Sequence, residues 1–390
     1  MSSLASHPVA RLPEEWAEIA RGAGERPFRA KEIFKWIHQR GVTNPANMTS
    51  LPAGLRTHEM LRGKELCKIE HVHRSKDGTR KLLLRMSDDA PIETVLLPRV
   101  SGPGSAGADA AEDDDDDDDA GALPNDSPHE PRYRVTQCIS TQVGCAMGCV
   151  FCASGVAGLT RHLGPEEIIS QVLIGRGALD PNEDLRGVVY MGMGEPLHNY
   201  QSVKRSLELL THRDGIALSK RRVTVSTSGL VPEIKKLGED FAGQIGLAIS
   251  LHAVTDEERS ALMPINKRYP LAELMKALRE YPLPPRRRIT IEYTLIAGKN
   301  DQPEQARRLV KLLSGIKVKV NLIPMNPIEA SALGPPSVSR VLEFQRVITE
   351  ANMSCFIRRT RGDEVGAACG QLALIGATRK IRAHRTPPSK

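Results

Sequence analysis

Four of the seven cysteines are crowded into one short stretch of the chain. Three of them, Cys145, Cys149 and Cys152, form the pattern C-x3-C-x2-C, and thiolates this close together can surround one metal centre. A structural zinc site needs a fourth ligand, usually from a second pair of ligands downstream. No second pair follows, because the later cysteines are isolated. Three thiolates on a four-iron cluster leave one iron open, so the missing ligand favours a cluster that also binds something else.

Polar residues and glycines follow the strands that the sequence predicts. Short apolar segments rich in β-branched residues alternate with amphipathic helical patterns between about residues 132 and 378, which is typical of a parallel α/β sheet. Chemistry collects at the carboxyl ends of the strands in such folds. The predicted strands are VTQCIS, GVVYMG, RVTVSTS, IGLAISL, ITIEYTLI, KVNLIPM and SCFIRR, and the segments that end them include MGMGEP, STSG, SLHA and PMNP.

Two smaller zones precede this array. Residues 1–62 have a helical pattern in which Ile33, Phe34, Trp36 and Ile37 form an apolar stripe among basic residues. We expect a small basic helical module that either packs on the rest of the chain or holds RNA. Residues 63–100 alternate in polarity on both sides of an Asp-Gly turn, which predicts a β-hairpin, and a third run there can extend its sheet.

The charge is unevenly distributed. Residues 101–131 contain 11 acidic residues and no Lys or Arg, so the rest of the chain carries a formal net charge of +18. The acidic segment has too few apolar side chains to offset the entropy of ordering, and we expect a disordered insertion. It is either a solvated linker, which we favour, or a polyanion mimic that competes with nucleic acid. The basic clusters indicate nucleic acid binding; they are Lys220–Arg222, Arg286–Arg288, Arg358–Arg361 and the tail, residues 379–390.

The sequence also indicates a compartment. It contains no run of 18 or more apolar residues that would span a membrane, and its N-terminus has no secretory signal. Seven cysteines, an odd number, do not resemble a secreted disulfide framework. We therefore expect a cytoplasmic protein that keeps its thiols for metal binding or catalysis.

The three-cysteine pattern, with Phe151 before the last cysteine, resembles the signature of the radical S-adenosylmethionine (SAM) superfamily. In that superfamily the open iron of a [4Fe–4S] cluster binds SAM, and an electron from the cluster cleaves SAM to a 5′-deoxyadenosyl radical. The stretch MGMGEP resembles the glycine-rich segment that approaches the SAM amino group, where Glu195 can receive an ammonium. The resemblance implies an α/β fold with a partial (β/α)6 TIM-like barrel over residues 132–378.

The resemblance is closer to the RlmN/Cfr group of RNA adenine methyltransferases. The motifs that resemble this group are, in chain order, QCISTQVGCAMGCVFCA, YMGMGEPLHN, VTVSTSGLVPEI, LAISLHA, MPINKRYPL, NLIPMNP and GDEVGAACGQL. The group implies methylation of C2 of adenine in 23S rRNA and tRNA, with two SAM molecules per turnover. By this resemblance Cys369 carries the methyl group as S-methylcysteine and becomes cross-linked to RNA. Cys138 then attacks its sulfur to release the product, and Glu93 accepts the ring proton.

The resemblance also assigns the cofactor contacts and the partners. Cys145, Cys149 and Cys152 would bind the cluster. Cys67 and Cys355 match no motif position, so we expect them to be buried structural residues. A flavodoxin- or ferredoxin-type electron donor, a thiol reductant and a monomeric enzyme are expected. The residues expected to contact SAM are Gly194, Glu195, Ser226, Ser250, Leu251, His252 and Asn326.

Two alternatives remain open from the sequence. The same machinery could methylate C8 of adenine instead of C2. A non-catalytic RNA-binding protein could also use the three cysteines for a structural metal. The acidic insertion lies between Glu93 and Cys138, where the group has a short turn, but closure entropy grows only slowly with loop length, so both assignments are kept.

Overall fold

A computed structural model describes residues 7–22, 24–100, 133–328, 331–358 and 361–372. The acidic insertion and the basic tail predicted above lie outside these residues. None of the helices in the described part of the chain has the length and apolar composition of a membrane span.

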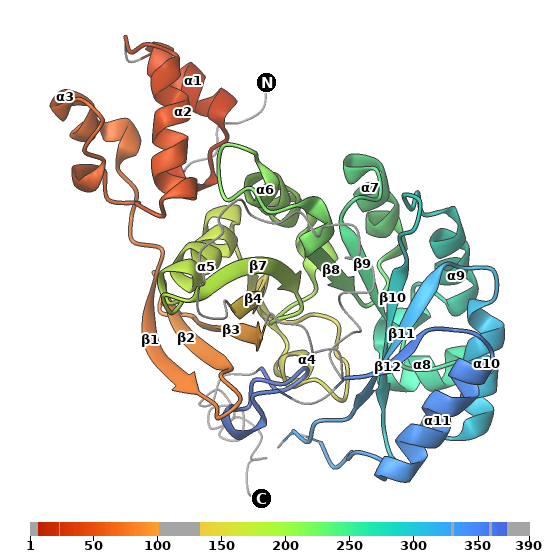
Figure 1. Cartoon of the computed structure of the whole chain (residues 1–390). Helices are drawn as coiled ribbons and strands as arrows, with labels where there is room; N and C mark the ends of the chain where they lie inside the picture. Colours follow the sequence, from red (N-terminus) through yellow and green to blue (C-terminus); the bar gives the residue numbers. More distant parts are fainter. Residues whose placement is uncertain (1–6, 23, 101–132, 329–330, 359–360, 373–390) are drawn as a thin grey trace, which may run out of the picture.

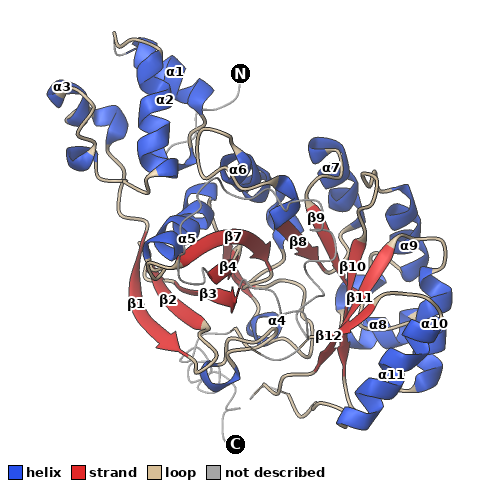
Figure 2. Cartoon of the chain, viewed as in Figure 1, coloured by secondary structure: helices blue, strands red, loops and turns tan. Residues whose placement is uncertain are grey.

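The fold is built on one ten-stranded sheet (Figures 1 and 2). Its first four strands pair antiparallel and all later neighbours pair parallel, so the last seven strands of the sheet form a continuous parallel array. In spatial order the strands are β1 (Cys67–Arg74), β2 (Arg80–Met86), β3 (Pro91–Val100), β4 (Tyr133–Cys138), β7 (Glu183–Tyr190), β8 (Val223–Thr227), β9 (Gly246–Ser250), β10 (Ile289–Leu295), β11 (Val318–Pro324) and β12 (Cys355–Ile357).

Helices follow each of the first six parallel strands, and they lie around the outside of the curved sheet (Figure 1). This arrangement confirms the partial (β/α)6 barrel, to which the short β12 adds a seventh strand. Proline is the first residue of α5 and α10 and the second residue of α7. At these positions its missing N–H costs no helical hydrogen bond. The helices are α5 (Pro165–Gly177), α6 (Tyr200–Thr211), α7 (Val231–Phe241), α8 (Asp256–Leu262), α9 (Leu271–Glu280), α10 (Pro303–Leu313) and α11 (Val338–Glu350).

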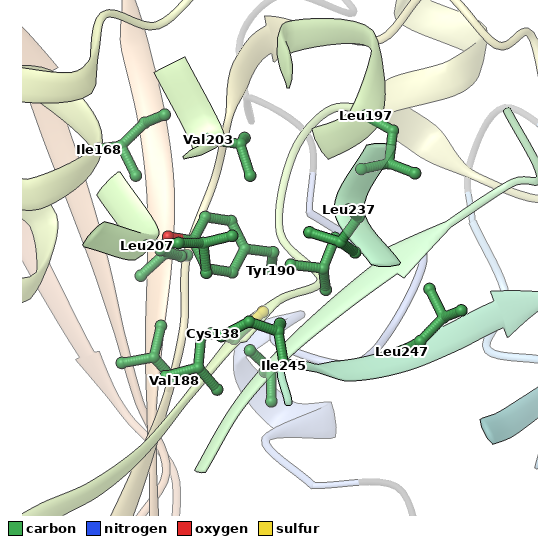
Figure 3. Packing of buried hydrophobic residues seen from close by; sticks show 14 of the residues in the cluster. Cys138, Ile168, Val188, Tyr190, Leu197, Val203, Leu207, Leu237, Ile245 and Leu247 are labelled. Atoms are coloured by element: carbon green, nitrogen blue, oxygen red, sulfur yellow. The ribbon is translucent and has the colours of Figure 1, made fainter. Parts of the chain in front are cut away.

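The core lies between these helices and the parallel strands. Figure 3 shows Val188 and Tyr190 of β7 among side chains of the surrounding helices, including Val203 and Leu207 of α6. All four side chains are buried, and each large apolar side chain contributes about 1.5–3 kcal/mol by leaving water. The Tyr190 hydroxyl is satisfied by the Ser206 hydroxyl at 2.6 Å, so no polar group is stranded there.

The predicted hairpin is present and continues the barrel sheet. Residues 75–79 connect β1 to β2, with Gly78 at a φ of 82° as the turn requires. β3 then pairs with β2 on one side and with β4 on the other. The antiparallel extension and the barrel therefore share one sheet, and side chains of β2 and β3 can take part in the barrel interior.

The N-terminal residues form short helices, as expected. They comprise α1 (Pro13–Gly22), α2 (Phe28–Phe34), a π-helical turn over Lys35–Gln39 and α3 (Ala53–Arg56). All four side chains of the predicted apolar stripe are buried. Arg176 of α5 donates to the carbonyls of His38 and Gln39, and Arg205 of α6 pairs with Glu15 at 2.9 Å. These contacts attach the helical module to the outside of the barrel.

Candidate active site

A cavity opens at the carboxyl ends of the parallel strands. Ten of the thirteen residues singled out from the sequence line it. They are Cys145, Cys149, Cys152, Gly194, Glu195, Ser226, Ser250, His252, Asn326 and Cys369. Leu251 instead lies fully buried behind the wall, where its carbonyl accepts from Arg259. Glu93 and Cys138 are buried on the antiparallel side of the same sheet.

The three clustered cysteines sit on a loop between two short paired strands, β5 (Gln142–Gly144) and β6 (Leu159–His162), which also contains α4 (Ala153–Ala157). The loop closes tightly because the Cys145 N–H donates to the Gly158 carbonyl at 3.0 Å. Gly144 has a φ of 77°, and a Cβ atom there would lie 1.8 Å from that carbonyl oxygen. Only glycine fits this position, so the sequence itself turns the following thiols toward the cavity.

The donor set fits a cluster better than a single ion. Among the described residues, no three His, Cys, Asp or Glu side chains converge closely enough to hold one metal ion. All three thiols line the same cavity, where thiolates from one loop could serve as ligands of a multi-iron cluster. Burial raises the pKa of Cys145 to about 12 and raises that of Cys149 as well. Binding a cationic centre must therefore displace their protons.

The Glu195 carboxylate is buried at the cavity and held in place by backbone hydrogen bonds. It is almost fully buried and accepts from the backbone N–H groups of Leu197 at 3.0 Å and Ser228 at 2.7 Å. Burial, the largest influence, raises its pKa, while these hydrogen bonds favour the charged form. Gly194 before it has a φ of 103°, and a Cβ atom there would lie 2.6 Å from Gln142. Glycine at this position therefore lets the backbone before Glu195 pack directly against Gln142.

The other predicted contacts lie at the ends of neighbouring strands. His252 adopts a φ of 57°, and its Nδ1 accepts the Thr294 N–H at 2.9 Å. Burial lowers the pKa of His252 to about 3, so the ring is neutral, and its edge meets Phe151 at 4.8 Å between centroids. Asn326 donates to the Cys369 carbonyl at 3.1 Å. A neutral imidazole and polar side chains therefore surround the cavity mouth.

Cys369 lies on residues 361–372, which cover the three-cysteine loop. The Ala153 N–H donates to the Gly370 carbonyl at 2.9 Å, and the Ser154 hydroxyl donates to the Leu372 carbonyl at 2.5 Å. The Cys369 side chain is exposed and faces the cavity that Cys152 also lines. The structure thus brings together two thiols that are more than two hundred residues apart in sequence.

Glu93 and Cys138 share one face of the antiparallel extension. Val95 of β3 is directly opposite Cys138 of β4, and Glu93 lies two residues along the same strand. Residues two apart on a strand point to the same side, as do directly opposed residues. Glu93 is buried, unlike the surface acid that composition alone suggests, and burial raises its pKa. Its Oε1 pairs with Lys81 Nζ at 3.0 Å, and its Oε2 has no hydrogen-bond partner among the residues that the structure describes.

The sequence reasoning missed several residues of this site. Glu292 and Arg358 line the cavity with their charged groups 3.9 Å apart, and Asn321 donates to Glu292 at 3.1 Å. A single acid within the apolar strand ITIEYTL was the available signal for Glu292. The buried Arg259 donates to the carbonyls of Ser228, Ser250 and Leu251, and so ties the ends of β8 and β9 together. As predicted, Cys67 and Cys355 are buried.

The fold and the cavity define a radical SAM enzyme, and comparisons with known proteins agree. Residues 139–310 match the model of the radical SAM superfamily, and residues 14–61 match the ribosomal RNA large subunit methyltransferase N-terminal domain. A crystal structure of a radical SAM methyltransferase from Sphaerobacter thermophilus is 37% identical, with a TM-score of 0.80, over 95% of this chain and 99% of that one.

Curated relatives extend over nearly the whole chain. The dual-specificity RNA methyltransferase RlmN of Sorangium cellulosum is 68% identical over 98% of this chain and 99% of its own length. The protein of the same name from Anaeromyxobacter dehalogenans is 43% identical over 94% and 91%. The chain belongs to the RlmN family of radical SAM RNA methyltransferases, enzymes that use a [4Fe–4S] cluster and SAM.

Proposed function

We propose that this chain methylates C2 of adenine in both 23S rRNA and tRNA, through S-methylcysteine at Cys369. The observation that carries the proposal is the cavity in which Cys369 and three clustered thiols meet the buried Glu195. Relatives named as dual-specificity RNA methyltransferases support two RNA substrates. The basic composition outside the acidic insertion suits a phosphate backbone, and the N-terminal helices are a candidate second grip on RNA.

The side chains divide the work by position. When bound, the cluster and SAM supply the methyl group and the radical that activates it. Cys145, Cys149 and Cys152 hold the cluster, and Glu195 receives the SAM ammonium with its carboxylate already oriented by two backbone N–H groups. The remaining polar residues of the cavity surround SAM; they are Gly194, Ser226, Ser250, His252 and Asn326, with Leu251 supporting them from behind.

Three residues act on the methyl carrier and the RNA. Cys369, exposed at the cavity, is the nucleophile that first accepts the methyl group. Glu93 accepts the proton that leaves adenine C2, a role suited to a buried carboxylate with one oxygen without a hydrogen-bond partner. Cys138, on the same face of the sheet as Glu93, then attacks the Cys369 sulfur. The bond between that sulfur and the methylene carbon breaks, the carbon takes up a proton, and the products are a Cys138–Cys369 disulfide and methylated RNA.

This scheme needs two external partners. A one-electron donor of the flavodoxin or ferredoxin type must reduce the cluster. A thiol reductant must also reopen the disulfide between Cys138 and Cys369 before the next turnover. The reducing cytoplasm, the compartment expected from the sequence, would supply both partners. The enzyme is proposed to act as a monomer.

Mass spectrometry of nucleosides tests the reaction. The chain is expressed in a strain whose RNA lacks C2-methyladenine, and 23S rRNA and tRNA are digested separately. We expect C2-methyladenosine in both pools and none with Cys369→Ala, which should retain about four irons per chain. Detection of C8-methyladenosine would show that C8 and not C2 is the methylated carbon. Modification of only one RNA pool would show that the other RNA is not a substrate. One zinc per chain with no SAM cleavage would refute the enzymatic proposal in favour of a structural metal.

A further inference from the structure

The segment that carries Cys369 rests on the β1–β2 hairpin. The Gly362 N–H donates to the Asp77 carboxylate at 3.0 Å, and Lys76 pairs with Glu364 at 3.0 Å. Deeper in the hairpin, Lys81 Nζ donates to the Gly366 carbonyl at 3.3 Å. The hairpin and the Cys369 segment are 285 residues apart in sequence at these contacts. The hairpin is therefore a support for the methyl-carrying residue as well as an extension of the sheet.

Lys81 also holds the candidate base. Its side chain is only 2% exposed, and its Nζ lies 3.0 Å from Glu93 Oε1. The register of the sheet places Lys81 directly opposite Val95, two residues from Glu93, so both charged groups point to the same face. A buried ammonium is costly unless it is paired and hydrogen-bonded. Glu93 and the Gly366 carbonyl together meet that requirement.

Other titratable groups lie near this pair. His73 of β1 is directly opposite Lys81 on this face, and burial, with smaller contributions from His71 and Lys81, lowers the pKa of His73. Lys81 is the charged group that acts on the Glu93 carboxyl. Neighbouring Arg80 points to the opposite face, where it pairs with Glu183. Helix α5, with its own charged residues, also packs on the face opposite Glu93. There the Gln137 side chain donates to the Thr94 hydroxyl and to the carbonyl of Gln171 in α5. On the Glu93 face β4 adds the Cys138 thiol and, farther along the strand, Arg134, which is opposite Arg99 of β3.

We propose that Lys81 is a positioning residue that fixes the ionised Glu93 carboxylate and the Cys369 segment relative to each other. One ammonium binds Glu93 Oε1 and the Gly366 carbonyl, and this leaves Glu93 Oε2 for the adenine proton. The role rests on the functions proposed above for Glu93 and Cys369. The proposal gives the hairpin a role in the reaction that is separate from binding the cluster or SAM.

The first test needs no turnover and uses the full-length, cluster-loaded protein. Hydrogen exchange of residues 361–372 and the alkylation rate of Cys369 are measured for Lys81→Met and Lys81→Arg. Lys76→Met is the matched control, because Lys76 pairs with the same segment from an exposed position. We expect exchange and alkylation to rise several-fold in Lys81→Met only, with recovery in Lys81→Arg. Equal behaviour of Lys81→Met and Lys76→Met would overturn the anchoring role.

The second test follows the protein–RNA adduct after a single turnover at several pH values. Glu93 acts only when ionised, and loss of Lys81 raises its pKa further, so the acid limb of adduct resolution moves to higher pH. An opposite charge at this distance lowers the pKa of a carboxyl group by about one to three units, so its removal should shift the acid limb by a similar amount. Lys81→Met should show this shift and accumulate adduct, while its iron content stays normal. Lys81→Arg should restore the wild-type profile.

Two further variants keep the proposal falsifiable. Lys81→Gln retains a hydrogen-bond donor without charge, so it should keep the segment anchored yet shift the pH profile; an unshifted profile would refute the charge role even if Lys81→Met does not fold. In a Glu93→Gln background, Lys81→Met should slow adduct resolution no further. If Glu93→Gln alone resolves adduct at the wild-type rate, the base assignment fails. A wild-type pH profile in Lys81→Met, with Glu93→Gln impaired, means that the Lys81 proposal fails.

Discussion

Glu93 and Cys138 show how a residue acquires a role from the strand that carries it. Each is unremarkable by type, yet the antiparallel register places both on one face of the sheet, and burial removes water from around the carboxylate. Thr94, between Glu93 and Val95, donates its hydroxyl to the Cys138 carbonyl at 2.7 Å. The alternation of side chains therefore directs Thr94 into a structural hydrogen bond and directs its neighbour Glu93, the proposed proton acceptor, to the opposite face.

At this scale the expected phenotype of Cys138→Ala is a trapped intermediate. Without the resolving thiol, the bond between Cys369 and RNA has no attacking sulfur, so a covalent protein–RNA species should accumulate after one turnover. Denaturing gel electrophoresis with radiolabelled RNA measures it. Cys355→Ala is the control, because that buried β12 thiol lies outside the cavity lining; it should cost about 1 kcal/mol of stability and trap no RNA. Multiple turnovers by Cys138→Ala would refute the assignment.

The sequence predicted much at the residue and element scale. Alternation and amphipathic spacing located the strands and helices, because burial of a sheet or helix face imposes those periods. The spacing of Cys145, Cys149 and Cys152 marked the loop that holds them. Lys81 was not predictable in the same way. Its importance arises from a register between strands and from a contact with Gly366 that bridges most of the chain, and no local pattern encodes either. Arg259 was missed for the same reason.

At the scale of elements, β3 and β4 are joined by the acidic insertion but do not depend on it. Their pairing continues to Val100 and Tyr133, the last residues on either side of the segment. A hairpin can be closed there by a turn of a few residues. The insertion is therefore separable from the placement of Glu93 and Cys138.

Replacement of residues 101–132 by a four-residue glycine-containing turn should leave methylation unchanged. Shortening the connection about eightfold lowers the closure entropy, so the free energy of unfolding should rise by about 2 kcal/mol. Chemical denaturation measures this change. RNA affinity distinguishes the two interpretations of the segment: a solvated linker predicts an unchanged dissociation constant, whereas a polyanion mimic predicts tighter RNA binding after removal. Loss of folding would show that the segment does support the β3–β4 pair.

For the whole molecule, the basic clusters are not all on the active side. Lys220–Arg222 directly precedes β8 and Arg286–Arg288 directly precedes β10, so both lie at the amino ends of parallel strands. The cavity opens at the carboxyl ends, where Arg358 lines it. Of the described clusters, the one that includes Arg358 is therefore placed to meet RNA whose adenine enters the cavity.

A triple variant, Lys220→Ala with Arg221→Ala and Arg222→Ala, should bind a short stem-loop RNA almost normally. If all three side chains contacted phosphates, the slope of log affinity against log salt would fall by about two. We expect a change well below one unit, and a clear loss of methylation in Arg358→Ala. Filter binding over a range of salt concentrations provides the slopes. A fall of two units would place RNA on the amino-end face and revise this orientation.

The dependence of the Cys369 segment on the hairpin has a consequence for the order in which the protein is made. Residues 76–81 leave the ribosome early, but their partners at 362–366 leave it near the end of synthesis. A nascent chain that has produced every barrel strand through Ile357 still lacks Cys369, the proposed methyl carrier. Such a chain could assemble the thiols for its cluster but would have no cysteine to methylate. A chain stalled before residue 369 would therefore be unable to attach itself to RNA.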